Sequence, residues 1–237
     1  MECRNFLSLF KRLLQEWADK DKSLEMPLSA IPKSCCPPQE QETLVFDFDT
    51  VMKNFCSEIK VSRLSSVDGL YLDEQRNIIY LLEMKSVANY LKYQQKKKEP
   101  TSDEKSQSDE KFQSIVKLLF EGEEDLFKTD DLEKKKESRR KAKATLAKKA
   151  GDSYLLFFAL FGYDTETGKH LIRCLLDERK FQIKYFIVVD MESKDYLNHR
   201  LAILNLLREK ITHGFLKSSN IGLVDAQSLD DTLKNAL

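Results

Sequence analysis

Two carboxylates and one ammonium group have types and spacings that could do chemistry at the end of a β-hairpin. Glu83 and Lys85 are two residues apart on an apolar segment, and a strand places such residues on the same face of a sheet. This segment, residues 78–85, and a second apolar segment, residues 67–72, flank a polar turn, which is typical of an antiparallel hairpin. Folding about that turn brings Asp68 beside Glu83. The three side chains are therefore expected to converge at one end of a sheet.

Such a trio has the composition of a metal-dependent hydrolytic site. Two carboxylates held close together repel each other, and both ionise readily only where a cation neutralises them. Mg²⁺ (or Mn²⁺) prefers oxygen ligands and binds through one or two carboxylates together with water and phosphate. A metal ion held there could polarise a phosphodiester and lower the pKa of a bound water. The ammonium of Lys85 could orient that water or stabilise the charge that develops on the phosphate.

The hairpin resembles the core of the PD-(D/E)XK nuclease superfamily, in which an Asp on one strand precedes an apolar strand that ends in Glu-x-Lys. The residues that carry this resemblance run from Val67-Asp68-Gly69 to Leu82-Glu83-Met84-Lys85-Ser86. The resemblance implies that Asp68 and Glu83 bind the divalent metal and that Lys85 assists the attacking water. It also implies that the backbone carbonyl of Met84 completes the metal shell. Glu58, on the preceding helix, would supply a further carboxylate.

The same resemblance implies a fold. The family core is αβββαβ, so the chain is expected to be an α/β (α+β) protein with a restriction-endonuclease-like mixed sheet flanked by helices. A helix over residues 141–161 would pack across the sheet, and residues 181–190, the strongest buried-strand run, would form the next core strand. The sequence departs from the family pattern in having Val67, not Pro, before Asp68. It also inserts roughly 45 residues between the hairpin and that helix.

A basic run leads into this helix. Residues 134–149 contain nine Lys or Arg residues and one acid, a local charge of +8, although the 39 basic and 39 acidic residues of the whole chain cancel. The zero sum excludes a protein that coats nucleic acid through bulk charge. A solvated helix face is the simpler interpretation of the run, but a basic helix beside a metal site would hold a phosphate backbone. We therefore expect a nucleic acid, with DNA as the first candidate, contacted by Arg139, Arg140, Lys141, Lys148 and Lys149.

Hydrophobic periodicity organises the rest of the chain. Apolar residues at helical spacing predict helices over residues 4–20, 50–61, 113–127, 131–161, 197–211 and 228–237. Gly151 is expected to weaken or break the fourth of these. Residues 43–49 form either a strand or the start of a helix, and residues 221–224 form a short final strand. We divide the chain into an N-terminal helical extension, residues 1–42, and a nuclease-like domain, residues 43–237, with a charged insertion at about 93–133.

Two other functions compete with nuclease activity. The first is a noncatalytic nucleic-acid-binding or assembly module that retains the nuclease fold. The second is a phosphatase, because residues 44–51 resemble the first motif of haloacid-dehalogenase-like phosphatases, with Asp47 as nucleophile and Asp49 as general acid. The Gly usual after the second Asp is Thr50 in this chain, and phosphate-binding turns need such permissive residues. The simpler interpretation is that Asp47 or Asp49 caps a helix.

The remaining motifs exclude several classes of protein. The five Cys and three His residues show none of the spacings of a zinc finger. The N-terminus has no signal-peptide pattern, and no apolar run approaches the ~20 residues that a membrane span needs. We therefore expect a cytoplasmic protein with no membrane partner, and a homodimer is left open.

Overall fold

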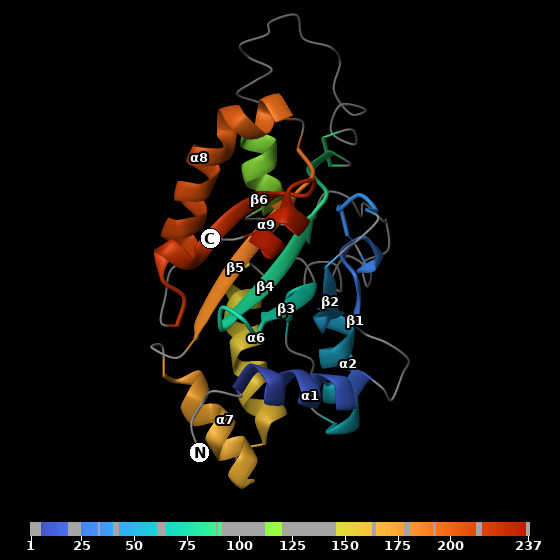
Figure 1. Cartoon of the computed structure of the whole chain (residues 1–237). Coiled ribbons are helices and arrows are strands. Elements are labelled where there is room, and N and C mark those ends of the chain that lie inside the picture. The colour runs from blue at the N-terminus through green and yellow to red at the C-terminus, as the bar shows by residue number, and fades with distance from the viewer. Residues whose placement is uncertain are drawn as a thin grey trace, which may run out of the picture.

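A single mixed sheet forms the centre of the molecule in the computed structural model. The structure describes residues 6–18, 25–32, 34–39, 43–60, 65–88, 90–91, 112–119, 146–162, 165–177, 181–191, 193–211 and 215–235. The strands are β1 (Glu25–Pro27), β2 (Leu44–Asp47), β3 (Gly69–Asp73), β4 (Ile78–Lys85), β5 (Gln182–Val189) and β6 (Ile221–Asp225), and they lie side by side in that order. Neighbours from β1 to β4 are antiparallel, whereas β4–β5 and β5–β6 are parallel (Figure 1).

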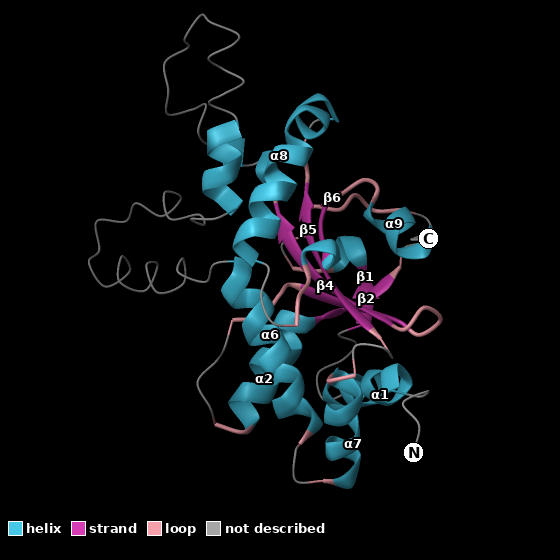
Figure 2. Cartoon of the chain, turned by 90° about the vertical axis from the view of Figure 1, so that its left-hand side faces the viewer, coloured by secondary structure: helices cyan, strands magenta, loops and turns pink. Residues whose placement is uncertain are grey.

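Helices cover both faces of this sheet, so the protein is an α+β protein with a mixed sheet flanked by helices. The helices are α1 (Phe6–Ala18), α2 (Phe48–Glu58), α6 (Leu146–Phe161), α7 (Glu166–Leu175), α8 (Ser193–Ile211) and α9 (Leu229–Asn235), with a further helix over residues 112–119. Figure 2 shows α2, α6 and α8 on one side of the sheet and α9 on the other. None of the helices in the described part of the chain is long and apolar enough to cross a bilayer.

The two faces of the sheet bury two separate hydrophobic cores. Ile79 and Leu81 of β4 join the larger core, which also contains residues of α1, α2, α6 and α7. Tyr80 and Leu82, which alternate with them, join the smaller core under α9. Because β4 is covered on both faces, its apolar run is continuous rather than alternating. This alternation assigns residue 83 to the face of the larger core, where α6 packs.

The β3–β4 hairpin has the predicted antiparallel pairing, and its turn fixes the register. Asp73 Oδ1 accepts hydrogen bonds from the backbone N–H groups of Gln75 (3.1 Å) and Arg76 (2.9 Å). Asn77 has a φ of 55°, a left-handed conformation that Asn tolerates better than most residues. Gly69 then pairs with Leu82. One position further along this register, Asp68 lies opposite Glu83.

Several predicted elements have different limits in the structure. The segment 43–49, expected to be either a strand or the start of a helix, contains both, since β2 ends at Asp47 and α2 begins at Phe48. β1 and α7 were not predicted. The N-terminal extension, residues 1–42, contributes β1 to the main sheet and residues of α1 to the larger core. Of the predicted helices 113–127 and 131–161, only residues 112–119 and 146–161 are described. The charged insertion otherwise lies outside the described residues.

Gly151 was expected to weaken or break its helix, and the break does not occur, because α6 continues through this residue. Glycine costs a helix interior about 1 kcal/mol relative to alanine. The apolar side chains on either side of it, among them Leu146, Leu156 and Phe157, are almost fully buried and more than offset that cost.

Substituting Gly151 tests this account of α6. A Cβ at Gly151 meets no atom within 4 Å, so Gly151→Ala should stabilise the protein by about 0.5–1 kcal/mol in urea unfolding. Gly168→Ala is the contrasting variant, because its Cβ would lie 1.7 Å from the carbonyl oxygen of Gly162 and should destabilise the protein. A loss of stability in Gly151→Ala would contradict the continuous helix.

Candidate functional site

The hairpin register places Asp68 opposite Glu83 at the end of the sheet. Asp68 precedes β3 and is 3% exposed. Its Oδ2 accepts a hydrogen bond from the backbone N–H of Met84 at 2.8 Å, and its backbone carbonyl accepts one from Phe48 N–H at 3.1 Å. The first bond ties Asp68 to β4, and the second ties it to the start of α2. The carboxylate is therefore fixed by backbone groups of two elements.

Glu83 is completely buried, which is unusual for a carboxylate unless it is paired. Its Oε1 lies 2.6 Å from Lys149 Nζ and 3.0 Å from Lys85 Nζ. Its Oε2 has no hydrogen-bond partner among the described residues. One oxygen of this carboxylate is therefore compensated twice, and the other keeps its full capacity to accept a hydrogen bond or to bind a cation.

Lys149 comes from α6 and lies between the two carboxylates. Its Nζ is 3.8 Å from Asp68 Oδ1 as well as 2.6 Å from Glu83 Oε1. Burial by itself would lower the pKa of Lys149, but the negative charges of Glu83 and Asp68, with a smaller contribution from Asp49, outweigh it and raise that pKa above its usual value. The ammonium is therefore charged at every physiological pH.

The loop that carries Asp68 is held by side chains of α6 and α2. Ser153 of α6 is fully buried, and its Oγ accepts a hydrogen bond from Val67 N–H at 3.0 Å. Asp152 accepts one from Ser65 N–H at 3.0 Å, and Ser66 Oγ donates one to Asp49 of α2 at 2.7 Å. Because Lys149 and Ser153 are four residues apart, they share one face of α6. The same helix face therefore positions Asp68 and neutralises it.

Tyr185 of β5 lies near enough to feel the charges of the carboxylates and was not predicted as part of the site. It is fully buried, and its hydroxyl donates to the backbone carbonyl of Leu146 at 3.3 Å. Burial, followed by the negative charges of Glu83 and Asp68, raises the pKa of Tyr185 well above its usual value. The phenol is therefore neutral and links β5 to the first turn of α6. In the sequence, Tyr185 is only one position of a predicted strand, and such a position is equally typical of a core residue.

The structure brings together some of the predicted site residues and not others. Asp68, Glu83, Lys85 and Lys149 meet, and Met84 contributes its N–H group to Asp68. Glu58 is exposed at the last residue of α2, roughly 15 Å along the helix from the end that contacts Asp68. The helix carboxylate whose charge reaches the site is Asp49, in the first turn. Glu58, which was predicted as a metal ligand, therefore lies at the opposite end of α2 from the cluster.

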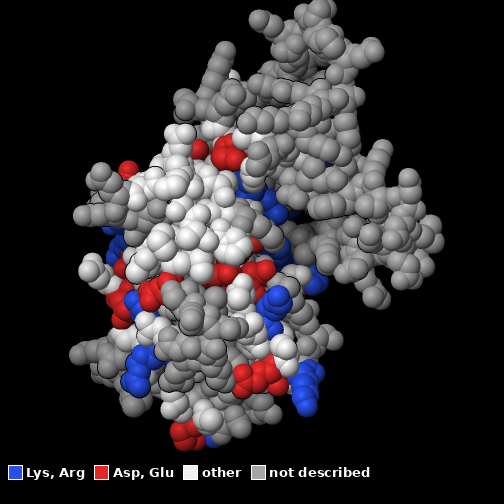
Figure 3. Space-filling model, turned by 90° about the vertical axis from the view of Figure 1, so that its right-hand side faces the viewer, with Lys and Arg blue, Asp and Glu red and all other residues white. Residues whose placement is uncertain are grey.

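The structure describes only some of the residues predicted to contact phosphate. Arg139, Arg140 and Lys141 lie outside the described residues. Lys148 is exposed on α6, and its Nζ lies 2.7 Å from Asp152 Oδ2. On the face shown in Figure 3, acidic and basic side chains of the described residues lie close to one another.

The residues of the phosphatase motif have structural partners. Asp47 is buried and caps α2, because its Oδ1 accepts a hydrogen bond from Thr50 N–H at 3.0 Å. This is the capping arrangement expected from the sequence as the simpler alternative. Asp49 accepts the hydrogen bond from Ser66 described above. Both residues thus support the segment that positions Asp68.

The ligand chemistry of the cluster suits a hard divalent cation. Asp68 and Glu83 offer carboxylate oxygens, and the unpartnered Oε2 of Glu83 is the kind of buried acceptor that a cation would complete. Within the described part of the chain, no three or more His, Cys, Asp or Glu side chains are grouped to hold a metal ion. Two carboxylates with water and a phosphate are enough for Mg²⁺, which commonly binds in this way.

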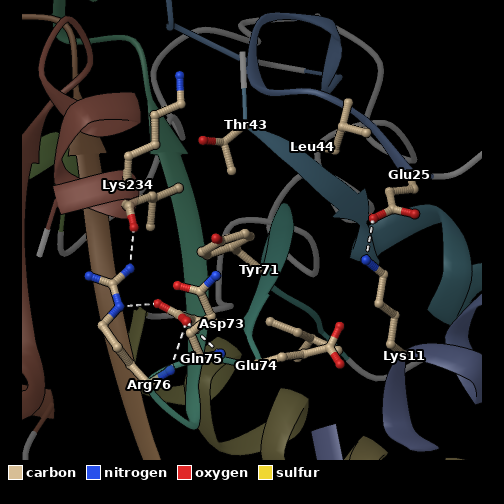
Figure 4. A pocket seen from close by; sticks show the side chains of 12 residues that line it. Lys11, Glu25, Thr43, Leu44, Tyr71, Asp73, Glu74, Gln75, Arg76 and Lys234 are labelled. Carbon is tan, nitrogen blue, oxygen red and sulfur yellow. Dashed lines mark hydrogen bonds and ion pairs between the residues drawn. The ribbon is translucent and has the colours of Figure 1, made fainter. Parts of the chain in front are cut away.

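A separate pocket of about 940 Å³ is lined by residues of β1, β2, β3, the β3–β4 turn and the C-terminal segment with α9 (Figure 4). Charged side chains in its wall are paired with one another: Lys11 Nζ lies 3.2 Å from Glu25 Oε1, and Arg76 binds Asp73. Arg76 also donates to the backbone carbonyl of Leu233. The Asp68–Glu83 cluster differs from this pocket in having a buried carboxylate oxygen, Glu83 Oε2, without a hydrogen-bond partner among the described residues.

Substituting Ser153 tests the positioning of Asp68 independently of any activity. Ser153→Ala removes the buried acceptor of Val67 N–H and should cost about 1–3 kcal/mol in the free energy of unfolding, measured in urea. Ser57→Ala, an exposed serine on α2, is the control and should change stability by less than about 0.5 kcal/mol. Equal stability of the two variants would show that this bond does not hold the loop.

Comparisons with known proteins supply no relative for this chain. No protein-family model, no curated protein and no solved structure matches it.

Proposed function

We propose that this protein is a metal-dependent nuclease that hydrolyses phosphodiester bonds of DNA with a restriction-endonuclease-like core. The observation that carries the proposal is the meeting of Asp68, Glu83 and Lys85 at the end of the β3–β4 hairpin, with both carboxylates buried. Burying two carboxylates side by side costs several kcal/mol per ion unless they serve a bound cation or are paired. A site of this composition matches the chemistry of phosphodiester hydrolysis.

The element order is compatible with such a core. Taking α1, β2, β3, β4, α6 and β5 in sequence gives a helix, three antiparallel strands, a helix, and a strand parallel to the last of the three. α2 is then an addition between the first two of these strands. The addition supports the site, since its first turn contacts the backbone of Asp68 and contributes Asp49.

Each residue of the site has a defined part in the proposed reaction. Asp68 and Glu83 would hold Mg²⁺ or Mn²⁺, with the carbonyl of Met84 as a further ligand. When bound, this ion supplies Lewis-acid polarisation of the phosphate and a lowered pKa for a bound water. Lys85, on the same face of β4 as Glu83, orients the attacking water and stabilises negative charge on the phosphate. The basic run before α6 holds the DNA backbone.

A noncatalytic nucleic-acid-binding module is the second candidate. One observation favours it: Lys149 and Lys85 together neutralise Asp68 and Glu83 through side chains of the protein itself. A fold of this kind could remain stable without a metal ion. DNA binding that survives Asp68→Asn, together with an absence of cleavage by wild type with Mg²⁺ or Mn²⁺, would support this candidate.

Glu83→Gln tests the proposed activity. With a labelled DNA duplex and Mg²⁺ or Mn²⁺, cleavage by this variant should fall by at least about 100-fold, since even outer-shell partners of a metal contribute 10–100-fold. Glu74→Gln, which changes an exposed carboxylate in the hairpin turn, is the control and should cleave as wild type does. Unchanged cleavage by Glu83→Gln would overturn the assignment of the site.

Charge removal from the basic run tests the interaction with DNA. Replacing Arg139, Arg140 and Lys141 together with Gln should weaken duplex binding uniformly across sequences. It should also reduce the slope of log K against log salt by about 0.9 for each phosphate that the variant no longer neutralises. Fluorescence anisotropy at several salt concentrations measures both effects. An unchanged slope would show that these residues do not bind phosphate.

A further inference from the structure

The Lys149 ammonium occupies the space in which a cation bound by Asp68 and Glu83 would be expected. It lies 2.6 Å from Glu83 Oε1 and 3.8 Å from Asp68 Oδ1. Lys149 is the fourth residue of α6, on the helix face that packs against the Asp68 loop. The carboxylate pair thus has a cation of its own, supplied by the protein.

We infer that Lys149 is a displaceable internal cation, which neutralises Asp68 and Glu83 when no divalent ion is bound and competes with that ion for the same oxygens. The inference rests on the proposed function and deepens it, because it gives the site a means of regulation. Metal binding and the Lys149 ion pairs are then negatively coupled. The energy of such coupling in proteins is typically about 1–3 kcal/mol.

The charge balance of the cluster is the first reason for competition. Asp68 and Glu83 carry two negative charges, and Lys85 and Lys149 carry two positive charges. A divalent ion added to this set would leave two positive charges in a buried site, of which nearby Asp49 offsets one. Uncompensated buried charge is costly, so release of Lys149 is the direct way to restore balance.

The geometry of the side chains is the second reason. Glu83 Oε1 already has two ammonium groups within 3.0 Å, and these repel each other. The Lys149 side chain is 16% exposed, whereas Glu83 is completely buried, so the lysine and not the carboxylate has access to solvent. Its four-carbon stem can move without movement of the helix. The freed ammonium then becomes available to a phosphate of the bound DNA.

Mn²⁺ binding in the absence of DNA tests the inference, measured by calorimetry or electron paramagnetic resonance on the full chain. Lys149→Met should bind Mn²⁺ about 5–150-fold more tightly than wild type, because the competitor is gone. Lys149→Arg should bind it more weakly, since a guanidinium can pair with both carboxylates at once. Lys169→Met removes a surface ion pair with Glu166 and should leave the affinity unchanged.

Thermal unfolding supplies a second readout. Without metal, Lys149→Met should unfold at a lower temperature than wild type, because two buried carboxylates lose a counter-charge. Mn²⁺ should raise the unfolding temperature more in Lys149→Met than in wild type. A general structural role for Lys149 would lower the unfolding temperature as well, but it would not enlarge the metal response.

Four results would overturn the inference. Equal Mn²⁺ affinities of wild type and Lys149→Met would show that Lys149 does not compete, while the proposed nuclease site would stand. Weaker binding by the variant would show that Lys149 assists the metal. A folded Lys149→Met that binds no Mn²⁺, with no binding by wild type, would overturn the proposed metal site together with the inference. If Lys149→Met does not fold, an Mn²⁺ affinity of Lys149→Arg equal to that of wild type overturns the inference.

Discussion

Burial of two carboxylates at the end of one hairpin is the constraint around which this structure is arranged. Asp68 and Glu83 are 3% and 0% exposed, and together they require compensation that the hairpin alone cannot give. The compensation comes from Lys85 on the same strand and Lys149 on α6, with a backbone N–H group for Asp68. Removing one partner of a buried ion pair typically costs about 3–5 kcal/mol. The packing of α6 on the sheet is therefore an electrostatic requirement as well as a hydrophobic one.

Helix α6 combines three tasks because of its periodicity. Its apolar residues, such as Leu156 and Phe157, join the larger core, Ser153 binds the loop before Asp68, and Lys149 reaches the carboxylates. The loop, the helix and the strand end are thus one cooperative unit, in which a shift of α6 would alter both the position and the charge of Asp68. A lysine that can leave such a unit gives the proposed site two states, one with an internal cation and one with an external one.

The α+β class of the fold and the hairpin that brings Asp68 near Glu83 could be predicted from local patterns. The runs 67–72 and 78–85, with the polar turn between them, contain the hairpin, and its register follows from the number of residues on each side of the turn. Predictions failed where packing overrules propensity, as at Gly151, whose cost is small beside the burial of its neighbours. They also missed β1, which has three residues and depends on pairing with β2.

The sequence by itself determined which side chains share a face of β4 and placed Asp68 within a residue or two of Glu83, because strand period and turn length are local properties. Only the tertiary structure decided that Lys149, in addition to Lys85 on the same strand, neutralises them. Lys149 is 66 residues from Glu83, and the distance at which it meets the carboxylate depends on how α6 docks. The choice of Asp49 over Glu58 likewise depends on which end of α2 contacts the hairpin. Electrostatic compensation between distant segments follows from packing, and no spacing within one segment encodes it.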